Sequence, residues 1–181
     1  FRNGLWWLFS SPPTNDSLRL FYSPTLTGTY TEHPLSPVVS NNADDSRGAG
    51  RLLDVDGRLY RFAQDDNPTY GNRTNAFEIT DLTTTTYAEV PYAGNPVLRA
   101  GGTGWNAVGM HTLNPVRLDD GTWVGSVDGL GDSSMMSKAG WSIAYVDSEE
   151  TTVENDPATK VLDGIATTFW PGRLQRLKRG P

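Results

Sequence analysis

The stretch Asp56-Gly57-Arg58-Leu59-Tyr60-Arg61-Phe62-Ala63-Gln64-Asp65 decides the fold class of this 181-residue chain. An Asp-Gly turn leads into a run in which aromatic and apolar residues recur with period two, the pattern of a strand entered from a tight hairpin. The pattern returns at Leu5-Trp6-Trp7-Leu8-Phe9 and at Trp123-Val124-Gly125-Ser126-Val127. A polar loop and a second strand follow each copy, at residues 18–23, 75–79 and 142–147. Repetition at a spacing of roughly 55 to 65 residues indicates stacked all-β modules.

The segments that close the first two units support the repeat. Residues 30–38 and 87–97 share Tyr, Glu, two Pro and Val in the same order. Because Pro cannot donate a ladder hydrogen bond, we expect both segments to be outer edge strands. A short leading strand is expected at 47–53, opening the second unit.

These units predict an all-β chain, a β-propeller of four-stranded antiparallel blades. We expect blades at about residues 1–40, 46–99 and 107–148. Residues 149–181 would add a partial strand near 161–170 and a basic C-terminal tail. Since five blades of this size need roughly 275 residues, we expect a fragment of a five-bladed ring, which other domains or chains complete.

Composition excludes several classes of function and partner. Fifteen Lys and Arg against 21 Asp and Glu give a net charge of −6, so we expect no nucleic acid partner. With no cysteine, the chain has neither a disulfide framework nor a thiolate metal site. No run of about 20 apolar residues is present, so no transmembrane segment is expected in this chain. The sequence does not determine the cellular compartment of the protein. We favour the secretory pathway or the extracellular space, with which the N-glycosylation sequons at Asn15 and Asn72 are compatible.

Residues 46–53 and 56–65, followed by Tyr70-Gly71, carry a family resemblance. They resemble the propeller domain in front of plant glucosamine inositolphosphorylceramide glycosyltransferases and of related bacterial and algal proteins. That domain is in turn similar to the five-bladed propellers of arabinanase and invertase type. The resemblance covers about residues 18–130 and implies a propeller associated with glycan chemistry. Arabinanase-type enzymes use three carboxylates on three blades. Asp65 and Asp128 stand at equivalent positions in two of the predicted blades, but no glutamate stands at such a position in a third.

Three residues are the candidates for catalysis: Asp65, His111 and Asp128. Inner strands of a propeller converge on its axis, so carboxylates that end two such strands would meet at the channel mouth and provide acid and base for glycoside cleavage. An imidazole there would bind a sugar hydroxyl or transfer a proton. The alternative for each residue is structural: acids after a strand also cap turns or pair with Arg, and a buried His also serves in the core.

Five further residues are candidates for contact with the substrate: Arg47, Gln64, Tyr70, Trp105 and Asn114. Arg47 and Arg61 are placed to hold the two carboxylates by bidentate hydrogen bonds, although for Arg61 we favour a structural ion pair. Trp105, in a glycine-rich loop, offers a ring face to a sugar, with core packing as the alternative. His33 is expected to be structural, and no metal site or cofactor is expected.

The function we expect is a carbohydrate-recognising domain that binds or acts on a glycan or polysaccharide at the channel mouth. One alternative is a glycoside hydrolase with paired carboxylates. Another is a non-catalytic structural or interaction subunit of a larger extracellular or membrane-associated assembly. If the domain takes part in catalysis, we expect a hydrolase or an accessory domain of a glycosyltransferase.

Overall fold

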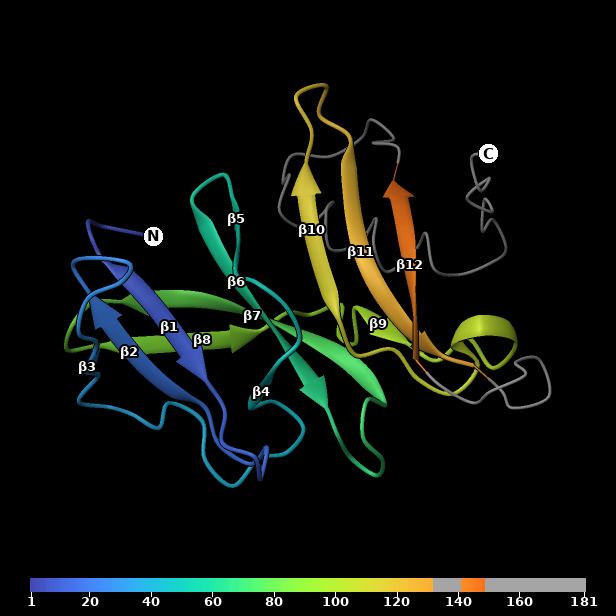
Figure 1. Cartoon of the computed structure of the whole chain (residues 1–181), viewed down its shortest axis with the longest axis horizontal. Coiled ribbons are helices and arrows are strands. Elements are labelled where there is room, and N and C mark those ends of the chain that lie inside the picture. The colour runs from blue at the N-terminus through green and yellow to red at the C-terminus, as the bar shows by residue number, and fades with distance from the viewer. Residues whose placement is uncertain (132–140, 149–181) are drawn as a thin grey trace.

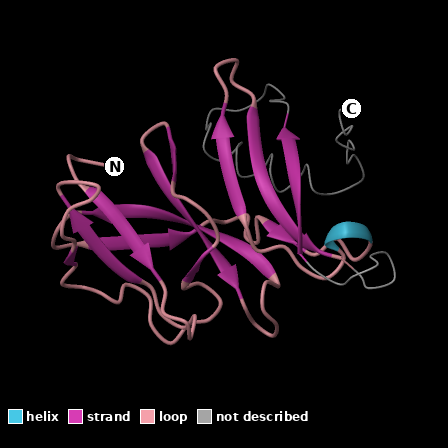
Figure 2. Ribbon diagram, viewed as in Figure 1, coloured by secondary structure: helices cyan, strands magenta, loops and turns pink. Residues whose placement is uncertain are grey.

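The structure, a computed structural model, describes residues 1–131 and the strand at 141–148. The described part is all-β, with the single-turn helix η1 (Gly104–Asn106) as its one helical element (Figure 2). The strands are β1 (Trp6–Ser10), β2 (Arg19–Ser23), β3 (Thr31–Glu32), β4 (Arg47–Gly48), β5 (Leu53–Val55), β6 (Arg58–Asp65), β7 (Arg73–Leu82), β8 (Tyr87–Pro91), β9 (Leu98–Arg99), β10 (Leu113–Arg117), β11 (Trp123–Leu130) and β12 (Trp141–Ser148).

The strands form three antiparallel sheets that follow one another along the chain (Figure 1). The first sheet has the order β1-β2-β3 and the third the order β10-β11-β12. Between them lies the middle sheet, β4-β6-β7-β8, in which β5 also pairs with β6 and β9 with β7. The antiparallel all-β class expected from the repeats is therefore confirmed, and no sheet closes on itself within the described residues.

A two-residue hairpin fixes where β6 begins. Asp56 and Gly57 both have positive φ, at 50° and 84°, as a type I′ turn requires. The backbone N–H of Gly57 donates to the Asp54 carboxylate at 3.0 Å. The turn expected from the Asp-Gly pair is confirmed, and it sets the register of β5 against β6.

The middle sheet buries both of its faces. Every residue of β6 from Leu59 to Asp65 is buried, as expected for a strand with a neighbour on each side. One face packs against the first sheet in an apolar cluster formed by Leu20, Leu59, Ile79 and Leu82, with Trp7 and Phe9 packed against it. The other face packs against the third sheet in a larger cluster that includes Tyr60, Phe62, Ala76, Leu98, Met110, Leu113, Trp123 and Val127.

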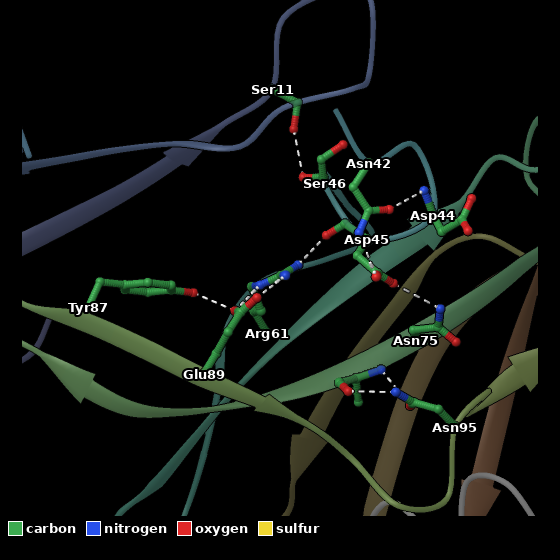
Figure 3. A network of polar contacts seen from close by, with 11 residues as sticks. Ser11, Asn42, Asp44, Asp45, Ser46, Arg61, Asn75, Tyr87, Glu89 and Asn95 are labelled. Atoms are coloured by element: carbon green, nitrogen blue, oxygen red, sulfur yellow. Dashed lines mark hydrogen bonds and ion pairs between the residues drawn. The ribbon is translucent and has the colours of Figure 1, made fainter. Parts of the chain in front are cut away.

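A polar network reinforces the contact between the first and middle sheets (Figure 3). The guanidinium of Arg61, 4% exposed, donates to the Glu89 carboxylate and to the carbonyl of Asp45 at 2.7 Å. Burial lowers the pKa of Arg61, but the bonds to Glu89 outweigh burial and the pKa lies above its ordinary value. Burial, together with the charge of Glu89, raises the pKa of Tyr87, which donates to the same carboxylate. The structural interpretation of Arg61 is confirmed.

The segment after β4 attaches the middle sheet to the third sheet. The N–H of Leu113 donates to the carbonyl of Ala49 at 2.8 Å. A Cβ atom added at Gly50 would lie 2.0 Å from the carbonyl oxygen of Leu113. Only glycine allows this close backbone approach, which brings β10 to the edge of the middle sheet.

Several predicted strands are shorter than expected. The edge segments 30–39 and 87–97 contain only β3 and β8, because their prolines remove donors from the ladder. The predicted strand 47–53 divides into β4 and the start of β5, separated by the segment that meets β10. In the third unit, by contrast, β11 extends to Leu130, beyond the run 123–127 that predicted it. The predicted strand 161–170 and the basic tail lie outside the described residues.

We expect Phe62→Ala to destabilise the protein by about 3–5 kcal/mol, because Phe62 fills the core between the middle and third sheets. The matched control is Val90→Ala on β8, where the side chain is 47% exposed and we expect a loss under about 1 kcal/mol. Chemical denaturation monitored by tryptophan fluorescence measures both. Equal losses in the two variants would contradict this packing.

Candidate functional site

A row of side chains crosses the middle sheet near the end of β6 and faces the third sheet. Arg47, Gln64 and Thr74 are paired across β4, β6 and β7, so they share one face. The hydroxyl of Thr74 donates to the carbonyl of Met110 at 3.4 Å. The next residue, His111, is thereby brought to the same end of the interface between the sheets.

His111 lies between a tyrosine and a carboxylate. Its Nδ1 is in contact with Oδ2 of Asp128, and its Nε2 lies 3.1 Å from the hydroxyl oxygen of Tyr70. The Tyr70 and His111 rings are nearly perpendicular, at 81°, with centroids 5.0 Å apart. Above the Tyr70 ring, the guanidinium carbon of Arg47 lies 4.8 Å from the centroid, a cation–π contact.

The backbone before β10 holds the Asp128 carboxylate in a fixed orientation. Its Oδ1 accepts hydrogen bonds from the N–H groups of His111, at 3.0 Å, and Thr112, at 2.8 Å. Burial raises the pKa of Asp128, but the bonds from the His111 side chain and backbone outweigh burial, so the pKa lies below its ordinary value. Asp128 is therefore a charged group at neutral pH, with both oxygens oriented by neighbours.

Gln64 contributes a buried acceptor beside this arrangement. The side chain is 6% exposed and its Nε2 donates to the carbonyl of Gly48 at 3.3 Å. Its Oε1 is buried and has no hydrogen-bond partner among the described residues. A buried amide oxygen without a partner is costly, so it marks a position where a ligand or water donor would be stabilised. We call Arg47, Gln64, Tyr70, His111 and Asp128 the strand-end cluster.

Asp65 is bonded to residues of its own hairpin. It is fully buried, with Oδ2 ion-paired to Arg73 and Oδ1 accepting from the N–H of Asn67 at 3.0 Å. The alternative in which Arg47 and Arg61 hold the two carboxylates is not what the structure shows: Arg61 pairs with Glu89, as favoured. Arg73 holds Asp65 because it is the residue opposite Asp65 in the β6–β7 ladder, and His111 holds Asp128.

Trp105 and Asn114 have packing and docking contacts. Trp105 packs against the core cluster and covers Gly129, where an added Cβ would lie 2.4 Å from its ring. Asn114 accepts a hydrogen bond from the N–H of Arg51 at 3.0 Å, which helps attach the middle sheet to β10. His33 is buried, with Nδ1 accepting from the N–H of Leu35 and Nε2 2.9 Å from the carbonyl of Thr83, in agreement with its structural interpretation.

Sequence reasoning missed two residues that shape the site, Arg73 and Thr112. For Arg73 a signal was present: Asp65 and Arg73 stand at the two ends of one hairpin loop, so strand pairing alone makes them partners. Thr112 gave no signal, because it acts through its backbone N–H. Within residues 1–131 and 141–148, no three His, Asp or Glu side chains gather as a metal site, and no helix there is long and apolar enough to cross a membrane.

Comparison with known proteins gives a consistent family match. The family model described as glucosamine inositolphosphorylceramide transferase 1, N-terminal, matches residues 1–130. Two relatives described as glucosamine inositolphosphorylceramide transferase 1, from Oryza sativa subsp. japonica and subsp. indica, are each 35% identical over 151 residues. Each match covers 77% of this chain and 20% of the relative, so the chain spans about a fifth of the relatives' length.

Asp128→Asn tests the electrostatics of the cluster. Because the folded-state pKa lies below the ordinary value of about 3.9, the charge of Asp128 stabilises the fold above about pH 4, and this stability is lost as pH falls through the folded-state pKa. We expect the variant to be less stable by about 1–3 kcal/mol at pH 7, with the difference closing as pH falls below about 4.

Urea denaturation at a series of pH values measures this difference. The control is Asp56→Asn, which removes the same charge at a turn position with positive φ that Asn tolerates. A stability difference for Asp128→Asn that persists unchanged at acid pH would show that the charge of Asp128 contributes nothing.

Proposed function

We propose that this chain, which belongs to the N-terminal domain family of glucosamine inositolphosphorylceramide transferase 1, is a carbohydrate-recognising domain that binds a glycan at the strand-end cluster. The observation that carries the proposal is the convergence of two strand ends. Residues from β4, β6 and the loop after β6 meet His111 and Asp128 of the third unit. Side chains from separate sheets are thus organised around one position, as a ligand site requires.

The propeller architecture belongs to this proposal. Its support is the middle sheet, which is covered on both faces by neighbouring antiparallel sheets. Blades of a propeller pack in this way, face to face around an axis. We propose that residues 1–40, 46–99 and 107–148 are three blades of a larger ring, with the cluster at the ends of their inner strands.

The chemistry of the cluster suits sugar hydroxyl groups. Arg47 supplies donors and Gln64 supplies a buried acceptor, so one hydroxyl can accept from the first and donate to the second. Tyr70, 46% exposed, adds an aromatic surface and a hydroxyl. Hydrogen-bond donors and acceptors held in fixed positions can bind a neutral polyol, so the ligand does not need a net charge.

The environment of Asp65 favours binding over paired-carboxylate hydrolysis. A glycosidase of that kind needs two carboxyl groups that both reach the substrate, about 5–10 Å apart. Asp65 is fully buried and both its oxygens are engaged by Arg73 and Asn67. The cluster thus retains one carboxylate, Asp128, and this carboxylate is engaged by His111 and Thr112.

The relatives give the binding domain a context. Their name describes a transferase, of which this chain corresponds to about a fifth. We propose that the domain is an accessory part of a glycosyltransferase and presents or retains a glycan for a separate catalytic domain. A purely structural role in a larger assembly is the alternative, and it predicts that the cluster binds no sugar.

Binding to a glycan array tests the proposal, using the purified chain with Arg47→Gln and Tyr70→Ala. We expect each variant to weaken binding at least about tenfold, because each removes a polar contact to the sugar. Arg19→Gln is the matched control, since Arg19 lies over the Phe21 ring in the first sheet as Arg47 lies over Tyr70. Absence of glycan binding by the native chain, or equal loss in the control, would overturn the proposed function.

A further inference from the structure

The face of the middle sheet that the first sheet covers carries an aromatic ring, an arginine and a glutamate in contact. Arg61 is directly opposite Phe77 in the β6–β7 ladder, and its guanidinium carbon lies 4.2 Å from the centroid of that ring. Glu89, on β8, forms an ion pair with Arg61. Because the first sheet lies over this face, the side chains of the ion pair are almost completely buried.

The first sheet repeats this arrangement on the face that points away from the middle sheet. Phe21 is directly opposite Glu32 in the β2–β3 pair, and the guanidinium carbon of Arg19 lies 4.9 Å from the centroid of the Phe21 ring. Arg19 donates to both oxygens of Glu32, at 2.9 Å and 2.5 Å. The two glutamates end the same Tyr-x-Glu pattern of the repeat, at 30–32 and 87–89. In the first sheet, however, the ion pair is exposed.

Apolar side chains surround the exposed ion pair. Trp7 packs toward the middle sheet, so its strand neighbours Trp6 and Leu8 point to the other face. Leu8 is directly opposite Phe21 and is 45% exposed. Phe1 extends this surface, with its ring centroid 5.1 Å from that of Trp6. We call these side chains, with the ion pair, the outer face of the first sheet; an exposed aromatic patch of this kind indicates an interaction site.

The third sheet, on the other side of the middle sheet, also has a face that points away from it (Figure 1). Trp123 and Val127 pack toward the middle sheet, so Val124 lies on the opposite face. Val116 is directly opposite Val124 and is exposed. Within the chain the first sheet covers the middle sheet, and the middle sheet covers the third. A third sheet that covers a first sheet would continue the same order.

We propose that a second copy of this chain docks on the outer face of the first sheet through Val116 and Val124 of its own third sheet, and that two copies close head to tail into one ring. Two chains of three described sheets each bring six blades together, within the range of four to eight that propellers use. A third copy would exceed that range, so the ring closes as a dimer with two identical heterologous contacts. This inference rests on the propeller arrangement proposed above and is independent of glycan binding.

Sedimentation of the purified chain over a range of concentrations tests the inference. We expect a dimer with a dissociation constant below about 10 µM. Leu8→Asp and Val116→Asp should each weaken association at least about a hundredfold, because each places a charge in both contacts of the ring. Val90→Asp is the matched control, since Val90 is as exposed as Leu8 but belongs to the middle sheet. Circular dichroism and thermal unfolding verify that each variant is folded.

Mixing the two variants distinguishes a head-to-tail contact from a symmetric one. The third sheet of Leu8→Asp and the first sheet of Val116→Asp are both native, so a mixed pair keeps one of its two contacts. We therefore expect the mixture to associate more strongly than either variant alone, with one variant labelled by a fluorophore to follow the mixed species.

A native chain that stays monomeric overturns the inference. So does loss of the dimer in Leu8→Asp but not in Val116→Asp, which would indicate that two first sheets face each other, and so do assemblies that grow beyond a dimer with concentration. Equal loss in Val90→Asp would show that the outer faces have no special role and would overturn it as well. A monomer that still binds glycans on the array leaves the proposed binding function intact, whereas a dimer that binds none overturns that function and leaves this inference standing.

Discussion

The burial of strand β6 on both faces is the constraint on which the rest of the structure depends. From Leu59 to Asp65 no side chain of this strand reaches solvent freely, so each polar residue in it must find a partner inside the protein. Arg61 is satisfied by Glu89 and Asp45 on the side of the first sheet. Gln64, on the side of the third sheet, is satisfied only in part, by Gly48. The strand that organises the core therefore also produces the candidate site where it ends.

The polar residues of the middle sheet form two groups, one on each face, and the two groups have different roles. Toward the first sheet, Arg61, Glu89 and Tyr87 form a closed network whose donors and acceptors bond one another, which suits a structural contact. Toward the third sheet, Tyr70 is partly exposed and the oxygen of Gln64 is unpaired among the described residues, which suits a contact with a ligand. Strands β6 and β8 of the middle sheet position the first network, whereas the second joins residues of the middle sheet to His111 of the third unit.

The candidate site was predictable only in its parts. His111 and Asp128 were selected because of their positions near a strand start and a strand end, and the structure brings them together with Tyr70. Asp65 follows the same sequence pattern as Asp128, yet it lies in an ion pair with Arg73. The pattern did not separate the two, because the partner of each carboxylate depends on which neighbouring strand lies beside it. Pairing of β6 with β7 placed Arg73 opposite Asp65, and pairing of β10 with β11 within the third sheet placed His111 beside Asp128.

By itself, the sequence determined the strand pattern, the Asp-Gly hairpin and the all-β class, because these follow from side-chain alternation and from backbone φ preferences that are local to each segment. It also carried the family relationship, which the comparisons confirm. Only the tertiary structure decided which polar residues share a site. Arg47, Tyr70 and Asp128 are far apart in the chain, and they meet through the packing of the middle sheet on the third sheet. Such long-range contacts depend on how whole sheets stack, and no local pattern of residues specifies that.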